Sequence, residues 1–357
     1  MKSFLIINPF GIGDVLFSTP LIRNIKENLP ESKIFYLCNR RAQPILENHP
    51  LIDKCFIYER DEFEAIRKRS KISWFKKILS FISEIKKEKI DVALDLSLNP
   101  QFGFLSFIAG IKERVGYDYK RRGRFLTKKI KFSGYKDKHV IEYYLDLLKY
   151  INLEPIHRKT ELFLSKIDKN KLDLWQRYNL SETNLNIVIA PCGGASWGLE
   201  AGYKHWNLEK FAQLADRSIS ELKARVILAG SRQEKEAIEK VERLMSNKPQ
   251  KAIGLELEDF LAILAKSQLA VVNDGGVLHM AVALGIKTVS IFGPVNEVVY
   301  GPYPIDSSKH VVLKVDIGCR PCYVNFRLPE CVYNKKCLND LEVSEVFKAV
   351  KSLMDKK

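Results

Sequence analysis

Between residues 269 and 294 the sequence alternates apolar runs with a glycine-rich turn, an order that few folds accommodate. The run at 269–272 is typical of a buried parallel strand, and it ends at Asn-Asp-Gly-Gly, residues that tolerate unusual backbone dihedral angles. A helical pattern of small residues follows at 277–284 and is closed by Gly285, before a second buried strand at 288–292. This order of strand, loop, helix and strand predicts one repeat of a parallel α/β sheet.

Asp274, Gly275 and Gly276 stand where the first of these strands gives way to the helix. In open α/β sheets, ligands bind at the carboxyl ends of the strands, and the first turn of a helix offers free N–H groups to an anion. A carboxylate followed by two glycines therefore suits a ligand that carries both hydroxyl and phosphate groups. The same residues would also serve as a helix cap and a turn, and a single Asp-Gly pair does not decide between the two explanations.

Strand and helix patterns alternate through both halves of the chain. Buried-type strands are predicted at 3–7, 33–37, 55–58, 92–96, 161–164, 186–190, 224–229, 269–272 and 288–292. A polar connector that contains Pro155 divides them near residue 160. With 357 residues, 46% of them hydrophobic, the chain is long enough for two cores. We therefore predict two doubly wound α/β domains.

Two motifs resemble those of a known family. The first is Gly-Ile-Gly-Asp-Val-Leu from Gly11, which lacks the third glycine of a dinucleotide fingerprint, and the second is Asn-Asp-x-Gly-x-x-His from Asn273, followed by Phe-Gly-Pro. Together they resemble the ADP-heptose:lipopolysaccharide heptosyltransferase family, glycosyltransferase family 9. The resemblance implies a GT-B fold, in which two Rossmann-like domains face one another across a cleft. It implies an acceptor domain at 1–160, a nucleotide-sugar domain at 161–338, and a helix at 339–357 that packs back toward the first domain.

The resemblance also implies roles for single residues. Asp14 would be the catalytic base, with Gly13 beside the acceptor. The donor-binding residues that the resemblance implies are Gly193, Gly194, Ser196, Lys204, Glu234, Leu255, Asp274, Gly275, Gly276 and His279. Lys204 and backbone amides would hold the pyrophosphate, so that the leaving group needs no metal ion. The family usually has Thr or Ser where Gly275 stands, and this departure leaves the identity of the donor open.

The formal net charge of +15 favours anionic partners. Arg121, Arg122 and Arg124 form a cationic loop that suits the phosphate or carboxylate groups of an acceptor, although a solvated run of charge explains it nearly as well. Residues 62–89 predict a basic helix, which fits an ordinary surface helix and also a helix that lies on an anionic membrane. We find no nucleic-acid-binding motif and expect no nucleic-acid partner.

Four of the seven cysteines follow the spacing Cys-x2-Cys-x8-Cys-x5-Cys. They are Cys319, Cys322, Cys331 and Cys337. In a reducing compartment, four thiolates at such a spacing suggest a structural zinc site, with reduced thiols and an iron–sulfur cluster as alternatives. We do not expect the chemistry to need this cluster.

The resemblance implies an inverting, metal-independent glycosyltransferase that moves heptose from ADP-heptose onto a lipopolysaccharide core or another lipid-linked glycan. A catalytically inactive GT-B protein that binds a nucleotide sugar or a glycolipid is the alternative. No apolar run reaches the roughly 20 residues that span a bilayer, and the start of the chain has no signal-type segment. We expect a cytoplasmic monomer, bound peripherally to the inner membrane through an anionic glycolipid acceptor, that needs no cofactor besides its donor.

Overall fold

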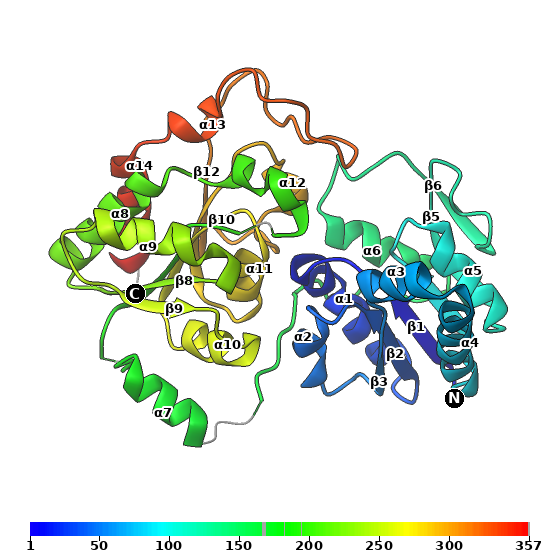
Figure 1. Cartoon of the computed structure of the whole chain (residues 1–357). Helices are drawn as coiled ribbons and strands as arrows, with labels where there is room; N and C mark the ends of the chain where they lie inside the picture. The colour runs from blue at the N-terminus through cyan, green and yellow to red at the C-terminus, as the bar shows by residue number, and fades with distance from the viewer. Residues whose placement is uncertain (166–168, 182, 194, 356–357) are drawn as a thin grey trace. The chain divides into compact units, whose positions relative to one another are not determined.

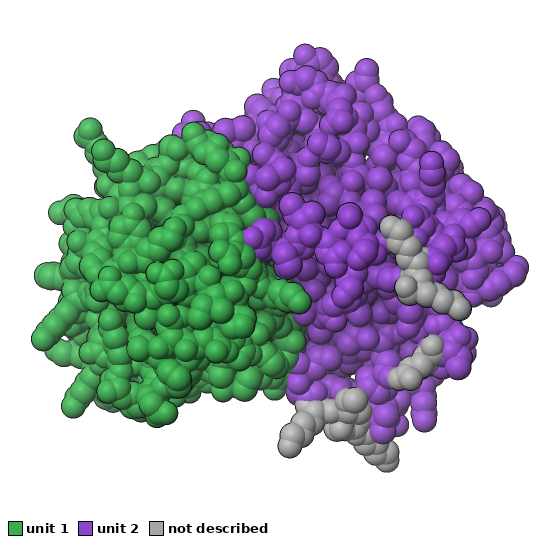
Figure 2. Space-filling model, turned by 180° about the vertical axis from the view of Figure 1, so that it is seen from behind, with its two compact units in different colours: residues 1–163 green, residues 164–357 purple. Residues whose placement is uncertain are grey.

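The computed structural model describes residues 1–165, 169–181, 183–193 and 195–355. The chain divides into two compact units, Met1–Phe163 and Leu164–Lys357, which Figures 1 and 2 show. The predicted domain limit at residue 160 lies close to this division. Each unit is described by itself below.

Unit 1 is built on a six-stranded parallel sheet with the strand order β3-β2-β1-β4-β5-β6. Its strands are β1 (Ser3–Ile7), β2 (Lys33–Cys38), β3 (Lys54–Ile57), β4 (Val92–Asp95), β5 (Glu113–Tyr119) and β6 (Lys128–Phe132). The strand order reverses between β1 and β4, and Ile7 pairs with Asp95 at the carboxyl end of both strands. In doubly wound sheets this reversal is where ligands bind.

The helices of unit 1 cover both faces of its sheet (Figure 1). They are α1 (Ile12–Asn28), α2 (Gln43–Glu47), α3 (Arg60–Arg69), α4 (Lys71–Lys87), α5 (Pro100–Ile108) and α6 (Val140–Lys149). Helices α3, α4 and α5 share one apolar core with β1, β2 and β4, while α1 packs against α6. The single basic helix predicted at 62–89 is two helices, because Ser70 ends α3 and its hydroxyl accepts a hydrogen bond from Ser73 N (3.2 Å), which caps α4.

Unit 2 repeats the topology of unit 1, with the order β9-β8-β7-β10-β11-β12 in another fully parallel sheet. Its strands are β7 (Asn186–Ala190), β8 (Arg225–Gly230), β9 (Gln250–Ile253), β10 (Leu269–Asn273), β11 (Lys287–Ile291) and β12 (His310–Leu313). The order reverses between β7 and β10. The strand, loop, helix and strand predicted at 269–292 are therefore β10, α11 (Gly276–Ala283) and β11, in the centre of the sheet.

The remaining helical elements of unit 2 connect these strands. They are α7 (Lys169–Arg177), η1 (Ala195–Lys204), α8 (Leu208–Leu222), η2 (Arg232–Glu234), α9 (Lys235–Leu244), α10 (Leu257–Ala265), α12 (Glu297–Tyr300), α13 (Lys336–Asn339) and α14 (Val343–Asp355). Helix α14 was predicted to pack back toward the first domain. Its buried side chains, among them Phe347 and Val350, complete the core of unit 2 against α8 and β11, and the packing toward the first domain stays a prediction. Within the described residues, no helix combines the length and the apolar character that crossing a bilayer requires.

Candidate functional site

The predicted donor-binding residues of unit 2 come together at one edge of its sheet. Gly193 and Lys204 follow β7, Glu234 follows β8, Leu255 follows β9, and Asp274 follows β10. These four strands are consecutive neighbours in the order β10-β7-β8-β9. Because the strands are parallel, all four connections leave the same carboxyl edge, and those after β7 and β10 flank the point where the strand order reverses.

Lys204 and Asp274 form a buried ion pair at this point. The Lys204 ammonium lies 2.5 Å from Asp274 Oδ2, and the two side chains are only 7% and 6% exposed. The ammonium also lies over the ring of Trp197, 4.4 Å from its centroid. Within the described part of the chain, Asp274 Oδ2 has no hydrogen-bond donor, so Lys204 balances its charge through the ion pair alone. The pair places opposite charges beside the first turn of α11.

Asn273, to which the sequence analysis gave no role of its own, holds the two loops around this pair. Its Oδ1 accepts a hydrogen bond from Trp206 N (3.0 Å), and its Nδ2 donates to Pro191 O (2.8 Å). Trp206 is buried and follows Lys204 closely, so one amide fixes both the loop after β7 and the segment that carries the lysine. These partners are far away in sequence, which is why no local pattern revealed them.

Backbone N–H groups complete the edge beside the ion pair. Gly276 opens α11 and Gly275 precedes it, so the free N–H groups of that helix face the carboxyl end of β10. Gly193 has φ +125°, which strains any residue with a side chain, and its carbonyl is 2.6 Å from His205 Nε2. His279 is buried on α11. Of the other predicted residues, Gly194 lies outside the described residues, and Ser196 is described in its backbone only, in η1.

Glu234 and Leu255 lie at the outer part of the same edge. The Glu234 carboxylate accepts hydrogen bonds from Ser231 N (2.7 Å) and Ser231 Oγ (2.9 Å), so it caps the turn in which it stands. Leu255 follows Gly254, whose N–H donates to Gly230 O (2.9 Å) and ties the two loops together. Their implied contacts with the nucleoside remain predictions.

Asp14 occupies the corresponding edge of unit 1. It stands with Gly13 in the first turn of α1, directly after β1, where the free N–H groups of a helix favour a negative charge. Asn8 Nδ2 donates to the carbonyl of Asp14 (2.8 Å) and so fixes the backbone at this turn. Burial, together with the nearby Asp14 carboxylate, raises the pKa of Tyr135 and of Tyr144, so both hydroxyl groups keep their protons beside it.

Asp95 is a second carboxyl group at this edge, and the sequence analysis gave it no role. It ends β4, next to β1, and its Oδ1 accepts hydrogen bonds from Ser97 N (2.9 Å) and Ser97 Oγ (2.6 Å). Burial raises its pKa to about 6. Only glycine fits at Gly116 on β5, since a Cβ there would lie 2.6 Å from the backbone oxygen of Asp95.

We expect the Asp95→Asn variant to be more stable than the parent protein, and increasingly so as the pH rises. A folded-state pKa of about 6 exceeds the usual value for an unfolded chain, so the folded state binds more protons between about pH 4 and pH 6 and loses stability across that range. Asparagine keeps an oxygen for both Ser97 bonds and carries no charge. Its advantage should be roughly twice as large at pH 8 as at pH 5, reaching on the order of 2–3 kcal/mol. Urea denaturation at both pH values measures it, and a pH-independent difference would contradict the prediction.

The three arginines of the predicted acceptor loop do not share one place. Arg122 lies over the ring of Tyr119, the last residue of β5, at 5.9 Å. Arg124 instead lies 4.9 Å from the ring of Phe125, whose carbonyl accepts a hydrogen bond from Arg114 Nε near the amino end of β5. Only Arg121 and Arg122 therefore stand close to the carboxyl edge that carries Asp14. The cationic loop predicted around them is the connection between two strands, β5 and β6, that the sequence analysis did not find.

The four cysteines of the predicted zinc site lie in and after one long loop that follows β12. Burial raises the pKa of the Cys322 and Cys337 thiols, and the neighbouring thiols of the cluster add to both shifts. The four side chains therefore influence one another. Within the described residues, however, no three Cys, His, Asp or Glu side chains are arranged to hold one metal ion. The zinc site that the spacing suggests therefore stays a prediction.

Known proteins resemble this chain over most of its length. The family model described as glycosyltransferase family 9 (heptosyltransferase) matches residues 78–332. The lipooligosaccharide heptosyltransferase 2 of Campylobacter jejuni is 23% identical over 359 residues, which cover 99% of this chain and 98% of that protein. The lipopolysaccharide core heptosyltransferase OpsX of Haemophilus influenzae is 23% identical over 307 residues, covering 85% of this chain and 82% of that protein.

Solved structures show the same fold. A glycosyltransferase family 9 protein from Veillonella parvula superposes with a TM-score of 0.83 at 21% identity, covering 100% of this chain and 98% of that one. The Escherichia coli heptosyltransferase WaaC with ADP gives a TM-score of 0.75 at 16% identity, covering 99% and 100%. The predicted α/β architecture of two doubly wound, Rossmann-like GT-B domains is confirmed.

Proposed function

The chain belongs to glycosyltransferase family 9, the heptosyltransferase family, and we propose that it transfers heptose from ADP-heptose to the core of a lipopolysaccharide precursor. Relatives named as lipopolysaccharide and lipooligosaccharide heptosyltransferases support the acceptor, and the WaaC structure with ADP supports the donor. The observation that carries the proposal is the convergence of Lys204, Asp274 and the first turn of α11 where the sheet of unit 2 reverses its strand order.

In this proposal unit 2 holds the donor. The ammonium of Lys204 and the N–H groups of Gly275 and Gly276 bind the pyrophosphate and stabilise the charge that develops on the departing nucleoside diphosphate. The leaving group then needs no metal ion. Asp274 accepts hydrogen bonds from the hydroxyl groups of the sugar. Glu234 and the backbone at Leu255 bind the nucleoside.

The acceptor binds to unit 1 in the same proposal. Asp14 takes the proton from the attacking hydroxyl group while the oxygen forms a bond to the anomeric carbon and the bond to the nucleoside diphosphate breaks. Attack from the side opposite the leaving group inverts the anomeric centre. Arg121 and Arg122 are the cations placed to meet anionic groups of the acceptor.

We propose further that the protein works as a monomer on the cytoplasmic side of the inner membrane. The anionic lipid-linked acceptor supports this location, and the formal net charge of +15 favours the attraction of an acidic glycolipid. A peripheral contact with the membrane would let the enzyme reach an acceptor that stays anchored in the bilayer.

A paired binding and turnover assay tests the function. The protein is mixed with ADP-heptose and a water-soluble core oligosaccharide that lacks heptose, and mass spectrometry follows the product while released ADP is counted. We expect an oligosaccharide heavier by one heptose and one ADP for each transfer. ADP-heptose should also raise the melting temperature more than UDP-sugars or GDP-sugars. A ligand that binds only the folded state stabilises that state by about 2.7 kcal/mol when the ligand concentration is about 100 times the Kd.

The alternative, an inactive protein that binds nucleotide sugars, gives a different result. ADP-heptose would raise the melting temperature of such a protein, but no ADP would be released in the presence of any acceptor. A melting temperature that rises only with another nucleotide sugar would overturn the assignment of ADP-heptose as the donor. Other nucleotide sugars are included in the assay because Gly275 stands where the family usually has Thr or Ser.

A further inference from the structure

Exposed apolar side chains gather on two helices of unit 1. On α4 these are Ile72, Phe75 and Leu79, exposed by 71%, 56% and 48%, and on α5 they are Phe104, Phe107 and Ile108, exposed by 45%, 54% and 41%. Both helices already bury other apolar side chains in the core beneath them. These six residues are therefore additional to the packing of the unit.

The apolar residues of α4 form a stripe on the flank that faces away from α3. Lys77 marks the flank toward α3, since its ammonium lies 3.2 Å from Glu62 of that helix. At about 100° per residue, Phe75 and Leu79 point roughly 160° away from Lys77 around the helix axis. Phe81 and Ile85, which are buried, point to the sheet between these two directions.

The exposed residues of α5 continue this stripe. Gln101 and Ile108 are seven residues apart and share one side of the helix, and Gln101 Nε2 donates a hydrogen bond to the hydroxyl group of Tyr58. The ring of Tyr58 lies 6.0 Å from that of Phe81 on α4 and 4.7 Å from that of Phe63 on α3, so this side of α5 faces the pair of helices α3 and α4. On its other flank, Phe107 lies 6.2 Å from the ring of Phe125. We call these seven residues the α4–α5 surface: Ile72, Phe75, Leu79, Phe104, Phe107, Ile108 and Phe125.

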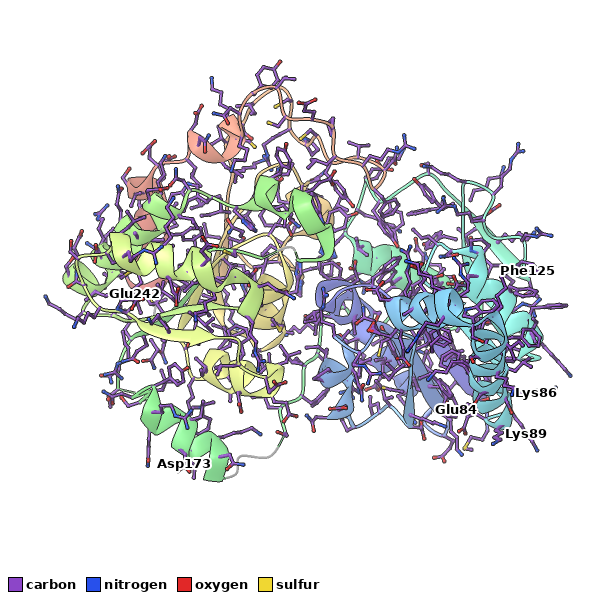
Figure 3. The ribbon with its side chains drawn as sticks, viewed as in Figure 1. Glu84, Lys86, Lys89, Phe125, Asp173 and Glu242 are labelled. Atoms are coloured by element: carbon purple, nitrogen blue, oxygen red, sulfur yellow. The ribbon has the colours of Figure 1, made fainter. Side chains whose placement is uncertain are left out.

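Positive charge surrounds the α4–α5 surface. Residues 71–89, which hold α4 and its end, contain six lysines and only two acidic residues, Glu84 and Glu88. Both acids lie close to Lys54, at 3.1 and 3.0 Å. Arg114 lies over the ring of Phe107 at 5.4 Å, and Figure 3 shows Phe125 near α5 with Lys86 and Lys89 at the end of α4. An apolar centre with cationic neighbours is complementary to a partner whose outer layer is negatively charged and whose interior is apolar.

We propose that the α4–α5 surface docks on the anionic face of a lipid bilayer, an inference that rests on the proposed function only in its choice of membrane. Phenylalanine and branched aliphatic side chains enter the boundary between head groups and acyl chains, while lysine and arginine stay with the phosphates. A second copy of the chain is a poor occupant, because it would bring the same positive charge to the contact. A nucleic acid would satisfy the cations and leave Ile72, Leu79 and Ile108 without an apolar partner.

Sedimentation with lipid vesicles tests the proposal on the full chain. Vesicles of phosphatidylcholine with about one third phosphatidylglycerol should bind the protein, while vesicles of phosphatidylcholine alone should bind it weakly. The double variant Phe75→Ser and Phe107→Ser should lower binding roughly tenfold or more, because it removes the largest rings that enter the bilayer. The matched control is Ile305→Ser with Val332→Ser in unit 2, two residues that are 81% and 80% exposed, and it should bind like the parent protein.

The electrostatic half has its own variant. Lys71→Glu with Lys76→Glu should weaken binding to the anionic vesicles, and about 1 M salt should remove most of the difference from the parent protein. Unchanged vesicle binding in both double variants would overturn the proposal. The proposal would also be overturned if the parent protein sedimented as a dimer and the variant Phe75→Ser with Phe107→Ser sedimented as a monomer. It would be overturned as well if the parent protein bound RNA and these apolar substitutions abolished that binding.

Turnover on the water-soluble oligosaccharide separates this inference from the proposed function. The phenylalanine double variant should keep that turnover and lose activity only on an acceptor embedded in vesicles. If the protein binds vesicles but has no transferase activity, the proposed function is wrong and the docking surface is supported. If it has full activity but does not bind vesicles, the docking surface is wrong and the proposed function is supported. A melting temperature equal to that of the parent protein confirms that the variant is folded.

Discussion

Replacing Asp14 by asparagine is expected to lower the turnover number by about 10²- to 10⁴-fold, the usual contribution of a general base. Asparagine has nearly the shape of aspartate, yet its amide group does not take up a proton at neutral pH. The backbone at this turn should stay in place, because Asn8 binds the carbonyl of Asp14 and not its carboxylate. The loss should therefore appear in catalysis and not in folding.

Two measurements make this result specific. Calorimetric titration should give the same Kd for ADP-heptose in the variant and in the parent protein, because the proposed donor residues all lie in unit 2. Asp61→Asn is the matched control, since Asp61 is an exposed acid in the first turn of α3, and it should leave turnover unchanged. Wild-type turnover in the Asp14 variant would show that another group accepts the proton.

The positions of Asp14 and Asp274 could be predicted because the motifs that contain them stand at the ends of strands. Asp14 follows β1 and Asp274 follows β10, and each sheet reverses its strand order at one of these strands. A parallel sheet brings such strand ends to one edge whatever the details of the helices. The local sequence pattern was thus sufficient to predict the edge of the sheet on which each residue lies.

Contacts between distant segments account for what the sequence did not reveal. The predicted strand at 161–164 is absent, because Glu161 N binds Thr19 Oγ1 (2.9 Å) and the Glu161 carboxylate binds Arg23 (2.9 Å), both on α1. In the opposite direction, β5 and β6 mix charged and apolar residues around a basic connection that contains Gly123, and we interpreted this stretch of the sequence as a loop. The pairing of β5 with β4 decides the matter, and a local pattern does not contain it.

The buried ion pair shows the same limit for the site. The family resemblance implies Lys204 at the pyrophosphate and Asp274 at the sugar, but it does not imply that the two groups bind each other. Their distance of 2.5 Å depends on Asn273, which holds the segment after η1 against the loop after β7. The proposed binding of the donor by Lys204 and Asp274 therefore depends also on the stability of the ion pair between them.

Replacing Lys204 by methionine is expected to reduce the free energy of unfolding of unit 2 by about 3–5 kcal/mol, the usual cost of leaving one member of a buried ion pair without its partner. The Asp274 carboxylate is 6% exposed and has no hydrogen-bond donor at Oδ2 within the described residues. Without the ammonium, the carboxylate must either keep an unbalanced charge in a buried place or take up a proton. Urea denaturation followed by the fluorescence of the unit's tryptophans measures this loss. Lys235→Met on α9, which breaks the exposed pair with Glu239, is the matched control and should have little effect.

The double variant Lys204→Met with Asp274→Asn separates stability from donor binding. A buried ion pair replaced by neutral groups of similar size often costs little, so the double variant should recover most of the stability that Lys204→Met loses. It should not recover the affinity for ADP-heptose, because the cation proposed to bind the pyrophosphate is still absent. Charged hydrogen bonds of this kind contribute about 1.5–3 kcal/mol, which corresponds to a Kd raised roughly 10- to 150-fold. A double variant that is stable and also binds ADP-heptose as tightly as the parent protein would show that Lys204 serves the fold alone, and the pyrophosphate would then have to be held by the N–H groups of α11.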